Sequence, residues 1–430
     1  MKNITSIVEK GLCTGCGTCA GICPVDAIKM RVCKGILIPE IDENKCTQCG
    51  LCVKCCPGFF VDFKSLNLEI FGKQPKDRLL GNYLNCYIGY SNDKEIRFNS
   101  SSGGIITQLL IFALENGLID GAIVTRMRKD DPLKPESFIA RTKKEIISAS
   151  KSKYCPTSTN EVLKYVLKKN EKYAFVGLPC QIHGIRKAER NIKDLRKKII
   201  FHIGLFCSHN VSFYGTEFLL KKFGISPDRV TKVAYRGTGW PGYMVIELND
   251  SSKLIVPYTR GFRAYWSVFS CFYFTPMRCL MCGDCTAELA DISVGDAWLP
   301  QFRKNNKGVS VVIARTEYGD DFLNLARSQK VVSLKPITSD DIRKSQKEPL
   351  KFKKYDLATR LNMLRTSGKD VPFFNVNFIS SESFLYFLRN SFVLINVKAS
   401  KKRTFRRLLL GVPLPFFRLF YGVYKFLCLI

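Results

Sequence analysis

The chemistry that this sequence could do is concentrated in its cysteines, of which there are 19. Two sets of four share one spacing, Cys-x2-Cys-x2-Cys-x3-Cys, and each set is followed by proline. Three cysteines two residues apart can bind one face of a [4Fe–4S] cubane, and the fourth reaches the neighbouring cluster. A zinc site would need pairs of cysteines instead of two quartets. The spacing therefore predicts these ligands for two clusters: Cys13, Cys16, Cys19 and Cys56 for one, and Cys46, Cys49, Cys52 and Cys23 for the other.

The same spacing is typical of bacterial two-cluster ferredoxins. Residues 1–60 are therefore expected to form a small ferredoxin module, in which glycines between the cysteines let backbone amides approach the sulfur atoms. Cys33 and Cys55 lie outside the pattern and are not expected to bind iron. Such a module carries single electrons and selects no substrate, so the rest of the chain must supply or take those electrons.

A third group of cysteines lies far downstream of the first two. Cys279, Cys282 and Cys285 have the spacing Cys-x2-Cys-x2-Cys, and two further cysteines, Cys180 and Cys207, each follow a short apolar segment. The ends of strands in an open α/β sheet are where ligands bind. A lone cysteine there is more often a small core residue, but two of them together with the triplet provide enough thiolates for a third iron–sulfur site.

A possible anion site precedes the apolar segment 105–115, which has helical periodicity. The preceding residues read NSSSGG and include Ser101, Ser102, Gly103 and Gly104. Free backbone N–H groups and the helix dipole favour negative charge at such a terminus, so the phosphate of a dinucleotide would suit it. A serine-rich helix cap is the alternative interpretation.

The elements that must position these residues form a mixed α/β pattern. Short apolar strands are predicted at 121–125, 173–177 and 199–206, and a hairpin at 243–248 and 253–256. Strands followed by helices favour a sheet with crossovers, whereas the hairpin indicates that the sheet is not purely parallel.

These patterns divide the chain into four regions and predict the α+β class. A two-cluster ferredoxin domain is expected at 1–60, a linker at 61–85, a mixed α/β core at 86–370, and a basic, aromatic, helical tail at 371–430. Residues 300–397 show ordinary α/β patterning and no recognisable chemistry.

Several blocks resemble one known family. They are NSSSGGIITQLL, SKY at 152–154, FVGLPCQIHGIRK, IGLFCSHNVS, YRGTGWPGYM at 235–244 and CLMCGDCTAELADISVGDAW, in this order over about residues 83–300. Together they resemble the coenzyme F420 hydrogenase/dehydrogenase beta subunits. The resemblance implies FAD and a [4Fe–4S] cluster in the core, and electron transfer between the deazaflavin coenzyme F420 and iron–sulfur partners. Because a plant relative uses the same cofactors on a chlorophyll intermediate, it implies these cofactors more firmly than F420.

The resemblance also implies site residues. The recurring cysteines of the family match Cys180, Cys207, Cys279 and Cys282, while Cys285 falls at a position that varies and is the rival ligand. For FAD, the pyrophosphate is expected at Ser101, Ser102, Gly103 and Gly104, and the isoalloxazine or ribityl part near Lys153, Gly239, Trp240 and Gly242. No general base is assigned, because the cofactors carry the chemistry.

The implied path explains the downstream cysteines. A flavin accepts a hydride from reduced F420, and a core cluster beside it passes single electrons through the ferredoxin clusters to an outside redox protein; the reverse direction fits equally. Two alternatives remain open. The same cofactors could serve another hydride donor or an organic acceptor, or the chain could be a non-enzymatic relay that has lost its flavin.

The formal charge is +30, of which three clusters would remove roughly six charges. The acidic tail of F420 would be attracted by basic groups such as Arg236, Arg260, Arg263 and Arg278. No groove-reading motif is present, so nucleic acid is not an expected partner. The three histidines are expected to serve in packing or hydrogen bonding, and Asp291 and Asp296 are expected to support the site or to cap a helix.

A cytoplasmic location is expected, because the cysteine spacings suit metal-bound thiolates in a reducing compartment and the first residues do not resemble a signal peptide. The tail from Lys398 onward has eight Lys or Arg residues and no acid, and its last 23 residues are strongly apolar. Pro413 and Pro415 disfavour a spanning helix. Peripheral contact with an anionic membrane and docking on the chain's own core both fit this composition.

Overall fold

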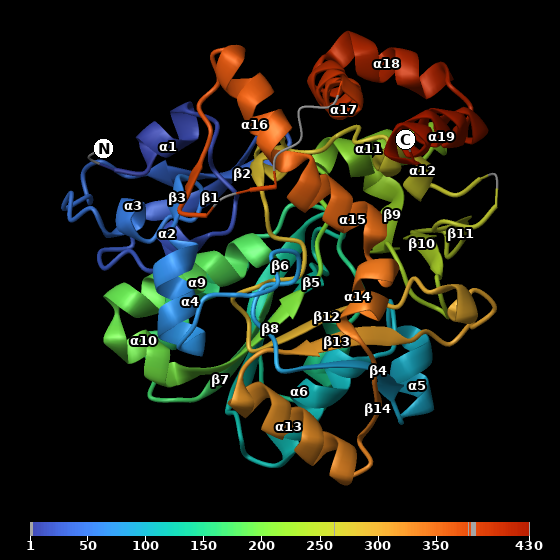
Figure 1. Ribbon diagram of the computed structural model, residues 1–430. Helices are drawn as coiled ribbons and strands as arrows, with labels where there is room; N and C mark the ends of the chain where they lie inside the picture. The colour runs from blue at the N-terminus through green and yellow to red at the C-terminus, as the bar shows by residue number, and fades with distance from the viewer. Residues whose placement is uncertain (1–2, 262, 377, 380–383, 430) are drawn as a thin grey trace.

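The computed structural model in Figure 1 describes residues 3–261, 263–376, 378–379 and 384–429. The N-terminal module contains a β-hairpin and three short helices. Their bounds are α1 (Thr5–Glu9), α2 (Thr18–Gly21), β1 (Ile28–Cys33), β2 (Ile36–Ile41) and α3 (Leu51–Lys54). The helices α2 and α3 occupy equivalent positions in the two cysteine repeats. Each follows a glycine with positive φ, Gly17 at 83° and Gly50 at 71°, a conformation that glycine adopts at little cost.

The region expected to be a linker contains regular structure. The short strand β3 (Phe60–Val61) is followed by the nine-residue helix α4 (Phe63–Phe71). Asp62 caps this helix by accepting a hydrogen bond from the Ser65 N–H at 3.2 Å, and the helix buries Phe63 and Leu66. One aspartate cap and two apolar residues one turn apart are thus enough to form a helix that weak periodicity did not indicate.

The core of the molecule is an eight-stranded mixed sheet with the order β14-β4-β13-β12-β8-β7-β5-β6. Its strands are β4 (Asn85–Ser91), β5 (Gly121–Met127), β6 (Pro135–Ala140), β7 (Tyr173–Gly177), β8 (Ile199–Leu205), β12 (Ile292–Asp296), β13 (Ser310–Ala314) and β14 (Val332–Pro336). The neighbours β5, β7, β8 and β12 are parallel, and the outer strands pair antiparallel. The sheet is therefore mixed, as predicted.

Helices cover both faces of this sheet. Their bounds are α5 (Lys94–Asn99), α6 (Ile105–Glu115), α7 (Lys143–Ser148), α8 (Leu163–Val166), α9 (Pro179–Asn191), α10 (Lys193–Lys198), α11 (Phe213–Lys222), α12 (Trp266–Ser270), α13 (Glu317–Ser328), α14 (Ser339–Ser345), α15 (Lys347–Leu350) and α16 (Leu357–Thr366). On one face α6 and α13 bury Leu109, Phe112 and Phe322 against the sheet. On the other, α9 packs with α8 and with α4 of the linker region.

Several predicted elements are confirmed. The helix α6 and the strand β7 have the predicted bounds. The predicted hairpin is β10 (Tyr243–Leu248) with β11 (Lys253–Pro257), and with β9 (Val230–Ala234) it forms a separate three-stranded antiparallel sheet. Short helical turns complete the core: η1 (Thr159–Val162), η2 (Pro227–Arg229), η3 (Met277–Met281), η4 (Pro300–Phe302) and the π-helical turn η5 (Lys351–Tyr355).

The C-terminal tail is helical, as predicted, and folds back on the molecule. It consists of β15 (Phe373–Phe374), which pairs parallel with β3, and the helices α17 (Phe384–Lys401), α18 (Arg403–Gly411) and α19 (Leu414–Leu429). Figure 1 shows these helices in red, grouped beside α11 and α12. Among the described residues, no helix combines the length and the apolar character needed to cross a membrane.

Candidate redox site

The candidate site lies where parallel strands end at one edge of the sheet. Cys180 is the second residue of α9, just after β7, Cys207 follows β8, and Asp296 ends β12. The carboxyl ends of parallel strands meet at the same edge, so these three residues come together although they are far apart in the sequence. The sequence-based expectation for the two strand-end cysteines rested on this geometry.

Four core cysteines face one another at this edge. Burial raises the pKa of the Cys180 thiol well above its usual value, and the negative charges of Cys282, Cys207 and Cys279 raise this pKa further. Burial likewise raises the pKa of Cys207 to about 12, with added contributions from Cys279 and Cys282. Thiols in such a group ionise readily only when a cation shares their charge, which is the environment that an iron–sulfur cluster would provide.

Cys285 lies beside this group, because it lines the same cavity as Cys207 and interacts electrostatically with Cys207 and Lys353, but its side chain also has apolar neighbours. It is fully buried and packs in an apolar cluster with Leu80, Cys86 and Val311. Its carbonyl accepts a hydrogen bond from the Cys207 N–H at 2.8 Å. This packing favours a structural role for the Cys285 thiol, although the backbone of the residue helps to position Cys207.

A buried lysine that the sequence did not reveal also faces these thiols. Lys353, in η5, is 2% exposed, and its Nζ lies 3.4 Å from the carbonyl oxygen of Cys279. Burial alone would lower the pKa of Lys353, but the thiols, led by Cys282 and Cys207, raise it above its usual value. In the sequence this residue is one of several lysines in KFKKY, and such a run reads as solvent-exposed.

The three histidines have packing and hydrogen-bonding roles. His183 Nε2 lies 2.8 Å from a carboxylate oxygen of Asp284, and His202 bridges Asp291 and Glu189 at 2.9 and 2.7 Å. His209 packs against Phe272 in a tilted arrangement and is stacked against Trp266.

Asp291 and Asp296 both belong to ion pairs, at opposite ends of β12. Burial alone would raise the pKa of Asp291, but Arg186 and His202 hold it far below its usual range. Arg186 donates to Asp291 at 2.9 Å, and Arg236 forms an ion pair with Asp296 at 2.9 Å. Asp296 lines the large cavity at the site, whereas Asp291 lies at the other end of β12, away from it.

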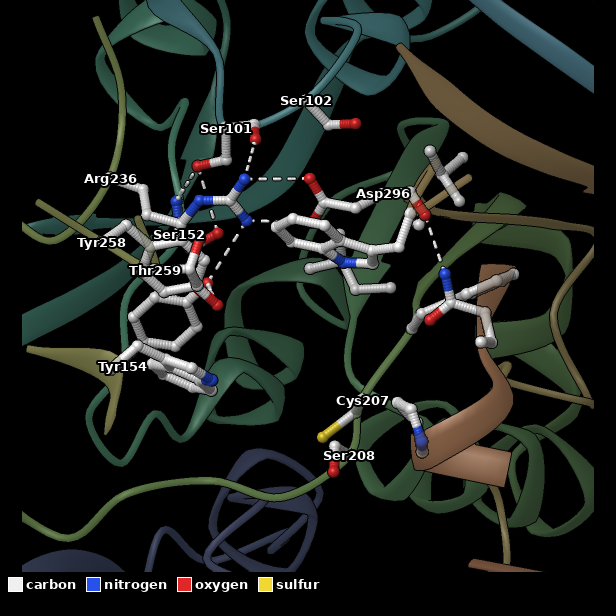
Figure 2. Close-up of a pocket in the computed structure, with 18 of the residues that line it drawn as sticks. Ser101, Ser102, Ser152, Tyr154, Cys207, Ser208, Arg236, Tyr258, Thr259 and Asp296 are labelled. Carbon is white, nitrogen blue, oxygen red and sulfur yellow. Dashed lines mark hydrogen bonds and ion pairs between the residues drawn. The ribbon is translucent and has the colours of Figure 1, made fainter. Parts of the chain in front are cut away.

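A cavity of about 1040 Å³ opens at the same edge of the sheet. Cys207 lies in its wall, and so do the first residues of α6. Figure 2 shows Arg236 between Ser101 and Asp296, with Cys207 farther along the same cavity. Pockets for small ligands usually measure about 300–1,000 Å³, so this cavity can hold a ligand of dinucleotide size.

The predicted phosphate loop forms one wall of the cavity. The Ser101 Oγ accepts a hydrogen bond from the Ser152 N–H at 2.8 Å, and Ser102 donates to the Val309 carbonyl at 2.9 Å. Ser101, Ser102 and Gly104 line the cavity. Gly103 instead packs against the backbone, because a Cβ there would lie 2.6 Å from the Gly89 oxygen. The loop therefore directs the N-terminus of α6 into the cavity.

The GWPG turn contributes its aromatic residue. Trp240 lines the cavity and donates from Nε1 to Asp296 at 2.8 Å. Gly239 and Gly242 have φ of 83° and 87° and allow close backbone contacts, since a Cβ would lie 2.8 Å from the Asn306 oxygen or 2.7 Å from the Gly237 oxygen. The two glycines therefore shape the turn that presents Trp240.

Several of the basic residues singled out from the sequence have specific partners. Arg236 is 1% exposed and pairs with Asp296, while Arg260 donates to the Arg303 carbonyl. Lys153 lines the cavity, where burial lowers its pKa to about 7, and its ammonium donates to three backbone carbonyls after α7: those of Ala149, Ser150 and Lys151.

Several ferredoxin cysteines lie close enough to their expected partners to interact electrostatically. Burial raises the pKa of Cys13 to about 12, and Cys56 and Cys16 raise it further. Burial also raises the pKa of Cys52, and the negative charges of Cys49 and Cys23 raise the pKa of Cys52 further. In the described part of the chain, no three His, Cys, Asp or Glu residues are arranged to hold a single metal ion; a cubane differs, since its four thiolates bind separate iron atoms.

The module sits directly on the core site. Cys16 is among the charges that raise the pKa of Cys180. The ammonium of Lys187, in α9, donates to the carbonyls of Cys56 and Phe60, both at 2.6 Å. Arg278, next to Cys279, donates to the carbonyl of Gly58 at 3.1 Å. Two buried cations of the core thus hold the end of the cysteine-rich module.

Family models match most of the chain. The N-terminal and C-terminal models of "Coenzyme F420 hydrogenase/dehydrogenase, beta subunit" match residues 86–164 and 170–340, and a "4Fe-4S dicluster domain" matches residues 12–58. A coenzyme F420 hydrogenase subunit beta of Methanothermobacter thermautotrophicus is 32% identical over 60% of this chain and 86% of its own length.

The chain belongs to the coenzyme F420 hydrogenase/dehydrogenase beta subunit family.

Other relatives agree with this membership. A coenzyme F420 hydrogenase subunit beta of Methanosarcina barkeri is 30% identical over 64% of this chain and 91% of its own. A coenzyme F420-dependent sulfite reductase of Methanocaldococcus jannaschii is 29% identical over 78% of this chain, but the match covers 49% of that protein. A chain of the solved F420-reducing [NiFe] hydrogenase complex of Methanosarcina barkeri aligns with a TM-score of 0.54 and 27% identity, over 69% of this chain and 98% of its own.

Membership confirms several expectations from the sequence. This F420 hydrogenase/dehydrogenase beta subunit family member is an oxidoreductase with an N-terminal 4Fe-4S domain. The family models end at residue 340, so Lys353 and the helices α17 to α19 lie beyond the matched region. The roles of Lys353 and of these helices are therefore inferred from their contacts in the structure.

Proposed function

We propose that this chain is a flavin-dependent iron–sulfur oxidoreductase that passes electrons between coenzyme F420 and an iron–sulfur partner. The observation that carries the proposal is one shared cavity. The same cavity of about 1040 Å³ is lined by the N-terminal residues of α6 and by Cys207, so a dinucleotide bound at the helix would have its other end near the core thiols. This is the arrangement that a cofactor linking hydride and single-electron transfer needs.

The residues in the cavity fit FAD. Backbone N–H groups at the start of α6, with Ser101 and Gly104, would hold the pyrophosphate, and aromatic rings in the cavity wall offer flat apolar surface. These rings belong to Tyr154, Trp240, Tyr258, Trp266 and Trp298. When bound, the flavin would accept a hydride and release electrons singly. The chain's own residues bind it, orient it and keep Cys207 beside it.

The core thiols would hold a third [4Fe–4S] cluster, with Cys180, Cys207, Cys279 and Cys282 as ligands. The packing of Cys285 in an apolar cluster supports this set over the rival one. The ferredoxin quartets remain those predicted from the spacing. The charge of Cys16 raises the pKa of Cys180, so the first ferredoxin quartet lies close to the core ligands. Electrons would therefore pass from the core cluster directly to the ferredoxin cluster held by Cys16.

The proposal that F420 is the substrate rests on the names of the relatives. Three kinds of relative carry F420 in their names: hydrogenase beta subunits, a sulfite reductase and an F(420)H(2) dehydrogenase subunit. Another hydride donor or an organic acceptor would use the same cavity and thiols, so this alternative differs in substrate alone. A relay without flavin is less compatible with a cavity of this size.

We also propose a protein partner and a cytoplasmic setting. The M. barkeri relative of known structure is part of a hydrogenase complex, which suggests that a redox subunit or protein receives the electrons here. Thiolate ligands need a reducing compartment. The C-terminal tail is the part of the chain that would meet a membrane.

An anaerobic experiment tests the proposal. The purified chain is reconstituted with iron and sulfide, its iron and flavin are determined, and reduced F420 is added while the flavin absorbance is followed. Roughly twelve irons and one FAD per chain, with bleaching of the flavin and then of the clusters, are expected.

The other outcomes separate the parts of the proposal. Roughly twelve irons with a flavin that does not respond to reduced F420 would keep the cofactors and move the substrate elsewhere. Roughly eight irons and no flavin would contradict both the third cluster and the use of the cavity.

A further inference from the structure

The helix α19 exposes a continuous apolar stripe. Five large side chains on one face of this helix are exposed to solvent, and their spacing of three or four residues, with one adjacent pair, aligns them along it. They are Phe416, Leu419, Phe420, Val423 and Phe426. Leu419 is 66% and Phe426 is 61% exposed. Single exposed apolar residues are common, but a stripe of this kind marks a contact surface.

The opposite face of the same helix is already used. Phe417 is fully buried and packs with Tyr273 and Phe218, and Tyr424 is buried against Phe272. The helix is therefore fixed to the core by one apolar face, and docking on the chain's own core leaves the stripe uncovered. If the tail only packed on its own domain, the buried face of α19 would be explained but the exposed stripe would not.

The tail helices are strongly basic, and no acidic residue occurs from 384 to 430. The exposed cations of the three tail helices and the turn between α17 and α18 are Lys398, Lys401, Lys402, Arg403, Arg407, Arg418 and Lys425. Figure 1 shows that α17, α18 and α19 are grouped at one end of the molecule. Clusters of four to eight Lys or Arg residues beside an amphipathic helix are attracted to anionic lipid headgroups.

We propose that the C-terminal helices dock on an anionic membrane surface, with the stripe of α19 inserted at the boundary between headgroups and acyl chains. The apolar stripe would meet the acyl chains, and the basic residues of the neighbouring tail helices would meet the headgroups. A second copy of the chain fits less well, because two tails of the same positive charge would repel each other.

Docking would also orient the molecule. Arg418, Gly422 and Lys425 belong to the wall of the large cavity, so α19 borders the cavity and carries the stripe. At helical spacing these three residues lie on a different face of α19 from the stripe, so membrane contact would separate the cavity from the lipid by one helix diameter, roughly 10–12 Å. Docking and redox chemistry are independent, because no residue of the stripe is a proposed ligand.

The test uses the full-length, reconstituted chain and two kinds of vesicle, phosphatidylcholine alone and phosphatidylcholine with phosphatidylglycerol. The stripe variant carries Phe416→Ser, Leu419→Ser, Val423→Ser and Phe426→Ser. A matched control carries the same number of serines at exposed apolar positions elsewhere: Val32, Leu68, Ile255 and Leu325, which are 44–59% exposed. Co-sedimentation measures binding, and iron content and circular dichroism report folding.

The chain is expected to sediment with the anionic vesicles at least about tenfold more strongly than with the neutral ones. Higher salt should weaken this binding, and the stripe variant should lose about tenfold or more while keeping its iron. The control should bind like the natural chain. Equal binding by the stripe variant, or no binding to anionic vesicles, would overturn the proposal. The proposal would also be overturned if light scattering showed the natural chain as a dimer and the stripe variant as a monomer, because a second copy would then cover the stripe.

Discussion

The side chains around the core thiols decide which cysteines hold iron. If Cys180, Cys207, Cys279 and Cys282 are the ligands, Cys180→Ala should lower the iron content of the reconstituted chain by about four atoms. Cys285→Ala should leave the iron content unchanged, because the Cys285 thiol packs in an apolar cluster. Iron analysis with electron paramagnetic resonance checks both variants. The reverse result, with loss in Cys285→Ala alone, would assign the rival set.

Lys353 is expected to tune the core cluster. A buried positive charge beside the thiols stabilises the more negative, reduced state, so Lys353→Met should lower the midpoint potential by on the order of 60 mV, the equivalent of about tenfold in a one-electron equilibrium. Lys353→Arg keeps the charge and is the matched control. A redox titration followed by paramagnetic resonance measures the potential, and an unchanged midpoint in the methionine variant with full iron would refute this role.

At the residue scale, the sequence could predict ligands with regular local spacing, but not those that depend on tertiary packing. The ferredoxin quartets repeat within a short segment, and the structure groups Cys13 with Cys56 and Cys52 with Cys23. Lys353 reaches the thiols only because η5 packs against η3, and nothing in KFKKY indicates this contact. The ion pair of Arg236 could not be predicted for the same reason, because its partner Asp296 lies 60 residues away in the sequence.

Equivalent glycines in the two cysteine repeats differ in their surroundings. Gly17 and Gly50 both have positive φ, but a Cβ at Gly17 would lie 2.9 Å from the backbone of Glu161 and Ser158, whereas none of the described atoms lies within 4 Å of a Cβ at Gly50. Gly50→Ala should therefore cost about 1–2 kcal/mol of stability through its backbone conformation, and Gly17→Ala about 1–3 kcal/mol more through the clash.

Thermal unfolding of the two reconstituted variants measures this difference. The melting temperature should fall in both, and clearly further in Gly17→Ala. Equal shifts would mean that η1 moves away to make room, and that the module is not tightly held there.

Elements with strong periodicity were predictable, and elements held by few residues were not. The helix α6 has apolar residues at helical spacing over its whole length and was predicted with its bounds. The helix α4 depends on one cap and on burial against α9, so its sequence gives little local signal. The strand β15 pairs with β3 across more than 300 residues of chain, and such a partner cannot be inferred from local pattern.

At the scale of the whole molecule, the ferredoxin module and the core behave as one body because buried cations join them. Lys187 and Arg278 donate to backbone carbonyls of Cys56, Phe60 and Gly58. An exposed ion pair, Arg190 with Glu69, also connects the core to the region after the module. A buried donor leaves its carbonyl acceptors unsatisfied when it is removed, at about 1–3 kcal/mol, whereas an exposed pair contributes about 0–1 kcal/mol.

Lys187→Met and Arg278→Met should therefore loosen the module, while Arg190→Met should not. Limited proteolysis within 72–81 measures this opening, and cleavage should be about fivefold or more faster in the first two variants. If the module carries the exit path for electrons, these variants should also reduce their ferredoxin clusters more slowly after the flavin is bleached. Unchanged proteolysis with slowed cluster reduction would show instead that the two cations act on the clusters through their charge, without holding the domains together.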